Sequence, residues 1–239
     1  MEELADKKIN LKKIIFSFVL AFVILYILIS KADIKAVFQI ISQADIMLVL
    51  LGFAVYYIMI LITSLRWKLL LENINFKARL SELTEIFFLG QFMNTILPAR
   101  LGDVYKSQLI KKNYGVARST IIGNIFVEKF LDVSTMLILL AISSIFVFGK
   151  FVPEDLKNLI AIGTAAIALA FIGILFSNKF KKYLIILIPK RFRNIATLFQ
   201  ESASSSLNMK RLPFVIALTI VLLGMESFIL YLVITSLGL

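Results

Sequence analysis

Long apolar runs, separated by shorter basic stretches, dominate the hydrophobic pattern of this 239-residue chain. A membrane-spanning helix needs about 20 predominantly apolar residues. The pattern therefore predicts an all-α, polytopic integral membrane protein with about five spanning helices. The third span must begin near Thr120, well before its most apolar part, and so carries polar residues into the membrane. We expect the spans at about 14–30, 46–64, 120–149, 158–176 and 212–238.

A sixth apolar segment, at 81–98, is short for a span. As a helix it would be about 25 Å long at ~1.5 Å per residue, whereas the hydrocarbon core is ~30 Å thick. It also contains Glu85 and Gln91 and ends at Pro98. These features favour a re-entrant helix, which enters the membrane and returns to the same side.

The positions of Lys and Arg orient the spans. The stretches that flank the sixth segment, 65–82 and 99–118, are both basic, as are the N-terminal arm and 177–211. Cytoplasmic loops carry an excess of Lys and Arg, and both flanks lie on that side only if the sixth segment is re-entrant. We therefore expect a single membrane domain over 1–239 with a cytoplasmic N-terminus. The basic stretches 65–82, 99–118 and 177–211 are expected to be cytoplasmic loops. This places a multi-pass protein in the cell membrane.

Two smaller patterns refine this picture. Apolar residues between Ile34 and Ile41 recur with helical spacing, which predicts an amphipathic helix lying on the outer surface. The span at 158–176 is rich in Gly and Ala. Small residues let helices approach closely, so we expect this span to pack centrally against others.

Composition narrows the chemistry that the chain can perform. The chain has no Cys and no His, which excludes disulfides, thiolate chemistry and zinc sites built from those residues. It also removes the residue most often used as a general base near neutral pH. We assign no catalytic residue and expect no metal and no cofactor. The net charge of +11 fits basic cytoplasmic loops, so we expect no nucleic-acid partner.

The stretch NTILPARLGDVYK breaks the sixth segment and concentrates charge at the break. Pro98 ends the helix and Gly102 permits a tight turn, so both are interpreted as a structural break. A new helix then fits 103–112, and its first turn favours anions. Arg100 can offer a planar fork to a phosphate, and Lys106 lies one turn from Asp103 and can pair with it. The alternative is an ordinary cytoplasmic turn with a capped helix.

Four charged residues fall inside predicted spans, where a charge is costly and tends to face a cavity or a partner. Glu128 and Asp132 share one helix face, and Lys129 can neutralise Asp132. These carboxylates either meet Arg100 or Lys106 across the helix break or form an internal salt bridge near the cytoplasmic interface. The final span carries one acid, Glu226, which is either functional or protonated and bonded to a neighbouring helix.

The order N-x-x-L-P-x-R-x-G-D, a basic residue three positions on, and then E-(basic)-x-x-D at the head of a span resembles the lysylphosphatidylglycerol synthase/flippase transmembrane family. The hydropathy is also similar, including the Arg66–Trp67 pair that closes the second span. Two family arginines appear here as lysines, which lack the bidentate fork. Family members usually continue for several more spans, so we expect the chain to lack the family's C-terminal portion. The matching residues are Asn94, Leu97, Pro98, Arg100, Gly102, Asp103, Lys106, Glu128, Lys129 and Asp132.

The resemblance implies a protein that handles lipids with charged or glycosylated phosphate head groups. The first hypothesis is a lipid flippase acting on a phospholipid or a polyprenyl-phosphate-linked lipid. The second is an intramembrane lipid-phosphate transferase, and the third is a non-catalytic subunit of a cell-envelope assembly. A homo-oligomer or a partner subunit is compatible with each. The head-group candidates are Asn94, Arg100, Asp103 and Lys106, with Glu128, Lys129, Asp132 and Glu226 balancing charge.

Overall fold

The structure is a computed structural model of the chain. It describes residues 34–97, 100–149, 151–187, 189–207 and 210–238, with isolated positions between 19 and 30, and leaves out the side chains of 175–188. Most of the expected first span at 14–30 lies outside the described residues, as does Pro98.

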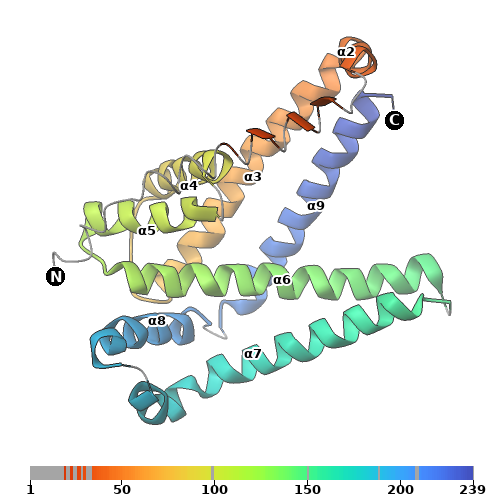
Figure 1. The fold of residues 1–239 in the computed structure, drawn as a ribbon. Helices are drawn as coiled ribbons and strands as arrows, with labels where there is room; N and C mark the ends of the chain where they lie inside the picture. The colour runs from red at the N-terminus through yellow and green to blue at the C-terminus, as the bar shows by residue number, and fades with distance from the viewer. Residues whose placement is uncertain are drawn as a thin grey trace. The chain divides into compact units, whose positions relative to one another are not determined.

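Helices form every regular element in the described part of the chain, which confirms the predicted all-α class. Four of these helices are long and apolar enough to cross a membrane: α3, α6, the Glu154–Ile174 part of α7, and α9. They coincide with four of the predicted spans, so the chain is a multi-pass membrane protein. In chain order the elements are α2 (Ile34–Ser42), α3 (Ile46–Glu72), α4 (Leu80–Ile96), α5 (Leu101–Tyr114), α6 (Arg118–Phe148), α7 (Glu154–Leu187), η2 (Lys190–Phe192), α8 (Arg193–Ser206) and α9 (Leu212–Ser236) (Figure 1).

The chain divides into two compact units. The first comprises Met1–Gly52 and Leu230–Leu239 and the second comprises Phe53–Ile229. In the first unit, α2 forms where the apolar spacing predicts a helix, and the Asp45 carboxylate accepts a hydrogen bond from the Met47 N–H at 2.8 Å to start α3. The two clusters of buried apolar residues lie in the second unit.

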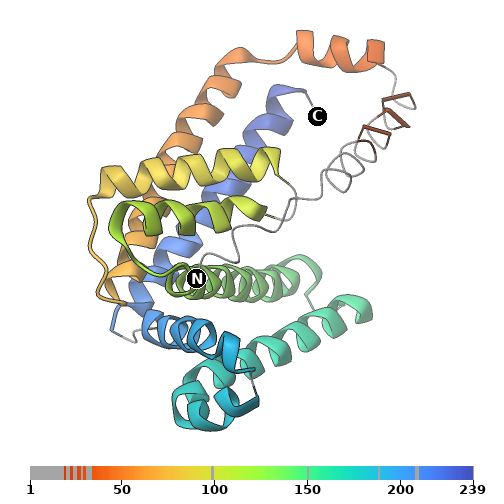
Figure 2. The ribbon, with the colours of Figure 1, turned by 60° about the vertical axis from the view of Figure 1, so that its left-hand side comes forward.

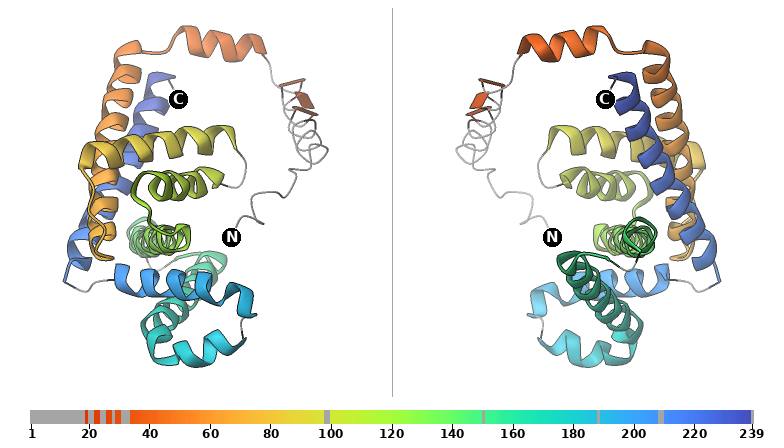
Figure 3. Two further views of the ribbon diagram at one scale, coloured as in Figure 1. Left: turned by 90° about the vertical axis from the view of Figure 1, so that its left-hand side faces the viewer. Right: turned by 90° about the vertical axis from the view of Figure 1, so that its right-hand side faces the viewer.

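Helices α4 and α5 form an antiparallel hairpin in the second unit, and two views show them side by side (Figures 2 and 3). At its open end the Tyr114 hydroxyl donates to Glu82 at 2.6 Å. That bond lowers the pKa of Glu82, while partial burial together with the bond raises the pKa of Tyr114 to about 12. Gly115, in the left-handed conformation at φ 73°, ends α5.

Both helices of the hairpin are short. With 17 residues, α4 extends about 25 Å, and with 14 residues α5 extends about 21 Å, at ~1.5 Å per residue. Neither reaches the ~30 Å of a hydrocarbon core. This length fits the predicted re-entrant segment, whose position in a membrane stays a prediction.

Gly102 has a different role from the tight turn that the sequence suggested. It lies inside α5, and a Cβ at this position would overlap the carbonyl oxygen of Gly90 and lie 2.5 Å from Oδ1 of Asn94. Gly102 is therefore needed for the close approach of α5 to α4. The residue with the unusual backbone is Arg100, the N-cap of α5, which lies in the left-handed region at φ 54°.

The stretch 177–211, expected as a loop, is mostly helical, because α7 continues to Leu187 and α8 follows. Helix α8 packs along α6 (Figure 2). A Cβ at Gly123 would overlap the carbonyl oxygen of Phe199, and the Ser202 hydroxyl donates to the carbonyl of Thr120 at 2.6 Å. Small and hydroxylated residues thus allow close packing here while satisfying their own polar atoms.

Helix α7 does not pack centrally, contrary to the prediction from its small residues. None of the residues in its most apolar window is buried. Gly163 approaches Leu137 of α6, but a Cβ added at Gly173 would meet nothing within 4 Å. Small apolar residues are tolerated equally well against lipid, so their presence alone did not decide which face is covered.

Candidate functional site

A cavity of about 580 Å³ lies in the second unit. Each of α3, α4, α6 and α9 presents one face to it with helical spacing, and the start of α5 contributes Arg100. The lining combines apolar side chains with six charged ones, an unusual content for a membrane domain. Its polar lining residues are Thr63, Arg66, Gln91, Asn94, Thr95, Arg100, Glu128, Lys129, Asp132, Thr219 and Glu226.

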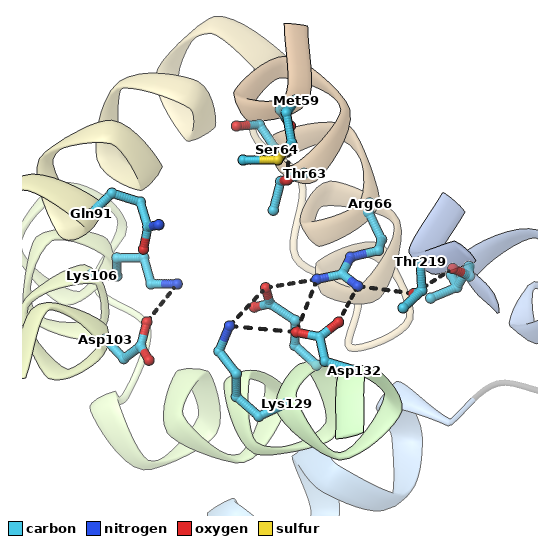
Figure 4. A network of polar contacts seen from close by, with 12 residues as sticks. Met59, Thr63, Ser64, Arg66, Gln91, Asp103, Lys106, Lys129, Asp132 and Thr219 are labelled. Atoms are coloured by element: carbon cyan, nitrogen blue, oxygen red, sulfur yellow. Dashed lines mark hydrogen bonds and ion pairs between the residues drawn. The ribbon is translucent and has the colours of Figure 1, made fainter. Parts of the chain in front are cut away.

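Arg66 connects three helices at one end of the cavity. From α3, its guanidinium donates to Glu128 of α6 at 3.1 Å and to both carboxylate oxygens of Asp132. It also donates to the Thr219 hydroxyl of α9 at 2.9 Å. Figure 4 shows Arg66, Asp132 and Thr219 converging from the three helices. A planar guanidinium suits this arrangement because it presents five N–H groups in a fixed plane.

Lys129 completes a group of two cations and two carboxylates. Its Nζ lies 3.7 Å from Glu128 and 3.5 Å from Asp132, which is beyond ordinary hydrogen-bond length. The Lys129 side chain is 36% exposed, whereas those of Arg66 and Glu128 are 4% and 0% exposed. This charge quartet of Arg66, Glu128, Lys129 and Asp132 is therefore neutral overall, but its two cations are held differently. Arg66 is fixed in it, and Lys129 faces the cavity with unused donor capacity.

Two atoms of the charge quartet are buried without a hydrogen-bond partner among the described residues: the donor Nε of Arg66 and one acceptor oxygen of the Glu128 carboxylate. A buried polar atom that lacks a partner is costly. Since both residues line the cavity, a bound polar group or water there would satisfy these atoms.

Lys106 is fully buried and is not among the residues that line the cavity. Its Nζ lies 2.9 Å from Asp103 and 5.1 Å and 4.9 Å from the ring centres of Trp67 and Phe87. A Cβ at Gly90 would overlap the Lys106 side chain, so this glycine makes room for it. Lys106 therefore packs the hairpin against Trp67 of α3. Apart from its ion pair with Asp103 of the same helix, its buried Nζ has no hydrogen-bond partner among the described residues.

Asn94 holds the tip of the hairpin. Its Oδ1 accepts a hydrogen bond from the N–H of Gly102 at 2.8 Å, and its Nδ2 donates to Gln91 at 3.2 Å. The first bond satisfies one of the free N–H groups at the start of α5. Asn94 thereby fixes the short connection that carries Arg100, and both residues line the cavity.

Arg100 and Glu226 are the two lining charges that have no ion-pair partner among the described residues. Arg100 is exposed at the start of α5. Glu226 lies seven residues, or about 10 Å, beyond Thr219 on the same face of α9. The cavity thus has a paired, neutral group at one place and two unpaired charges of opposite sign elsewhere.

The structure places most of the predicted site residues around one cavity. Asn94 and Arg100 line it, as do Glu128, Lys129, Asp132 and Glu226, whereas Asp103 and Lys106 are not among its lining residues. The partner of both carboxylates from another helix is Arg66. That they also meet Arg100 or Lys106 stays a prediction. Sequence reasoning assigned no site role to Arg66, Thr219 or Gln91. The signal for Arg66 was present, since an arginine inside a long apolar helix requires a partner.

The described residues contain no group of three or more carboxylates that could hold a metal ion. What the cavity offers is recognition by charge and hydrogen bonding: a guanidinium, an ammonium, two amides and a carboxylate within apolar walls. This combination suits an anionic or zwitterionic head group.

Comparison with known proteins supports a membrane family. A UPF0104 membrane protein of Methanocaldococcus jannaschii is 30% identical over 148 residues, which are 62% of this chain and 62% of that protein. A UPF0104 membrane protein of Pyrococcus horikoshii is 28% identical over 61% of this chain and 44% of its own length. The glycosyltransferase AglD of Haloferax volcanii is 23% identical over 61% of this chain and 23% of that protein.

The matches thus span less than two thirds of the length of these relatives. No solved structure matches this chain. A family model described as the lysylphosphatidylglycerol synthase TM region matches residues 14–239. The chain therefore belongs to the family of lysylphosphatidylglycerol synthase transmembrane regions.

Proposed function

We propose that this membrane domain translocates a lipid with a phosphate-bearing head group by admitting the head group to the cavity. The observation that carries the proposal is the pair of cations, Arg100 and Lys129, that face the cavity with unused hydrogen-bonding capacity. A phosphate accepts strong hydrogen bonds from both types of side chain. The family described by the matching model is itself named for a lipid.

The geometry of Lys129 supports a site that a ligand can complete. Its two contacts to carboxylates are too long for good hydrogen bonds, so a phosphate can compete with them for the ammonium. Asp132 would keep its bonds to Arg66 after such a movement. Arg66, Glu128 and Asp132 therefore act as a fixed support beside the movable ammonium of Lys129.

The apolar part of the lining suits the upper part of the lipid tails. Met59, Ile60, Val133, Met136 and Leu222 share the cavity with the charged residues. A lipid needs both environments at once, because its phosphate is costly to dehydrate and its tails are costly to hydrate.

We further propose that the α4–α5 hairpin is re-entrant from the cytoplasmic side of the cell membrane and that the N-terminus is cytoplasmic. The support is the length of the two helices and the basic residues at the two ends of the hairpin, Lys77 and Arg79 before α4 and Lys111 and Lys112 in the last turn of α5. Irregular backbone at membrane depth is tolerated where it lines a protein cavity, and Arg100 does so at the tip. Cysteines introduced at Lys77 and Lys112 test this, because the chain has no native cysteine. Labelling from opposite sides would contradict the re-entrant arrangement.

Translocation is tested by reconstitution of the full chain in liposomes that contain a fluorescent phosphatidylglycerol. A membrane-impermeant reductant reports the fraction of head groups on the outer leaflet with time. Arg100→Ala is expected to slow the exchange roughly 10- to 100-fold, since a hydrogen bond to a charged group contributes about 1.5–3 kcal/mol. The matched control is Lys157→Ala, which removes an exposed cation that pairs with Glu154 on α7, outside the cavity. Equal rates in protein-free and protein-containing liposomes would refute the proposal.

A transferase acting on a lipid phosphate is the second candidate, favoured by the similarity to a protein named a glycosyltransferase. In that case Asp132 or Glu226 would serve as the base, since both line the cavity. Incubation of the purified chain with a lipid phosphate and a sugar-nucleotide donor distinguishes the two, because translocation alone forms no new lipid.

A further inference from the structure

The charges that line the cavity balance. Three cations and three carboxylates contribute to the lining, so the empty cavity is neutral when all six are ionised. Lys106 and Asp103, which are not among the lining residues, form a further neutral pair. A net charge in a membrane interior is costly, and balance is the arrangement expected of a stable resting state. The six are Arg66, Arg100, Lys129, Glu128, Asp132 and Glu226.

Entry of a lipid head group disturbs this balance according to its own charge. A monoanionic head group makes the occupied cavity negative by one charge. A zwitterionic head group, with a phosphate and an ammonium, leaves it neutral. Balance returns in the first case if one carboxylate takes up a proton, and the question is which carboxylate can do so at least cost.

Glu226 is the carboxylate that is free to take up the proton. Glu128 and Asp132 accept hydrogen bonds from Arg66, and protonation of either would weaken the charge quartet. Glu226 has no ion pair or hydrogen bond from any described residue, so its protonation breaks no described interaction. Its side chain also lines the cavity, within reach of the charge of the bound phosphate.

No other unpaired carboxylate in the described lining of the cavity could take up the proton in place of Glu226. Helix α3 contributes Tyr56 and Arg66, and the start of α5 contributes Arg100. Helix α4 contributes no titratable side chain, only amides, a hydroxyl and a phenyl ring. Helix α6 contributes the other charged members of the lining, Glu128, Lys129 and Asp132.

We propose that Glu226 is a proton-binding site linked to the charge of the head group, so that an anionic lipid enters the cavity together with one proton and a zwitterionic lipid enters without one. The proton comes from water and binds a carboxylate oxygen of Glu226, and it leaves when the lipid leaves. The inference rests on the proposed function, since it takes the cavity to be the head-group site. It gives a proton gradient a means to bias the movement of anionic lipids.

The test measures binding of short-chain phosphatidylglycerol and short-chain phosphatidylethanolamine to the full chain in detergent. Calorimetry in two buffers of different ionisation enthalpy counts the protons taken up per lipid. For phosphatidylglycerol we expect uptake approaching one proton, and affinity that falls as pH rises. For phosphatidylethanolamine we expect neither effect.

Glu226→Gln mimics the protonated carboxylate and should bind phosphatidylglycerol without proton uptake, with affinity that no longer falls as pH rises. The matched control is Glu85→Gln, an exposed carboxylate on α4 outside this cavity, which should behave like the unmodified chain. The buffer comparison on the unmodified chain needs no variant and is decisive even if Glu226→Gln does not fold. Binding of phosphatidylglycerol without proton uptake overturns the linkage alone, as does a pH slope that persists in folded Glu226→Gln. Failure of both lipids to bind at every pH overturns the proposed function and the linkage with it.

Discussion

Replacement of Arg66 by methionine tests the charge quartet most sharply. Methionine keeps much of the side-chain volume and removes the guanidinium, so the loss reports polar interactions more than packing. Arg66→Met leaves Glu128 fully buried, and Lys129 at 3.7 Å becomes its remaining ion-pair partner in the described structure. Asp132, whose side chain is 28% exposed, can regain solvent. Thr219 still donates to the carbonyl of Val215 at 2.9 Å.

The magnitude follows from this difference in burial. Removal of one partner from a buried ion pair costs about 3–5 kcal/mol, because the other charge stays buried without compensation. Most of the cost should come from Glu128. Glu128→Gln in the Arg66→Met background should therefore recover much of the stability, with a coupling energy of about 2–3 kcal/mol.

The assay is unfolding of the chain in mixed micelles by increasing mole fraction of sodium dodecyl sulfate, followed by circular dichroism, for both single variants and the double variant. Arg211→Met is the matched control. Arg211 forms a 2.6 Å ion pair with Glu72, but both side chains are partly exposed, so its loss should cost at most about 1 kcal/mol. The reasoning is refuted if Arg66→Met costs no more than Arg211→Met, or if the effects of Arg66→Met and Glu128→Gln simply add.

Three further predictions concern the hairpin. Gly102→Ala should destabilise the chain by about 1–3 kcal/mol in the same unfolding assay, because the added Cβ overlaps α4. Gly173→Ala is the control, since a Cβ there meets nothing within 4 Å and should not change stability. Equal effects of the two substitutions would contradict the packing argument. Tyr114→Phe should raise the pKa of Glu82 toward its ordinary value of about 4.3, because the bond that lowers it is lost. The bond stabilises the folded chain above the unfolded-state pKa of Glu82, and this stabilisation is lost as pH falls through the lower folded-state pKa. The free energy of unfolding should therefore fall less steeply at acid pH in the variant than in the unmodified chain. Arg100→Gly should relieve the left-handed backbone and stabilise folding by roughly 1 kcal/mol, yet slow lipid exchange in liposomes; loss of stability would contradict the strain assigned to φ 54°.

The fold class was readable from sequence because its signal is local. Runs of apolar residues long enough to span a membrane have few other uses, and four of the predicted spans are long apolar helices in the structure. Boundaries were less predictable. Helix α3 was expected to end near Ser64 but continues to Glu72, because its last two turns pack Trp67, Leu70 and Leu71 into the core. Such packing depends on distant residues and leaves no local mark.

The site was predictable as a set of residue types but not as a set of pairs. Charged residues in apolar helices tend to face a cavity or a partner, and this rule predicted site roles for Glu128, Asp132 and Glu226. The partner of the first two, Arg66, is 62 and 66 residues away in the sequence, and nothing in the spacing selects it over Arg100. The role of Gly102 was hidden for the same reason, because the need for glycine arises from a second helix.

Protection of a cavity cysteine by lipid tests the central claim most directly. The chain has no cysteine, so Thr63→Cys places a unique thiol on the cavity wall. Thr84→Cys is its control, because Thr84 makes the same hydroxyl bond to the carbonyl four residues earlier but lies outside this cavity. Short-chain phosphatidylglycerol should slow the reaction of a water-soluble thiol reagent at Thr63→Cys and leave Thr84→Cys unchanged. Equal protection at both positions, or at neither, would contradict the assignment of the cavity as the lipid head-group site.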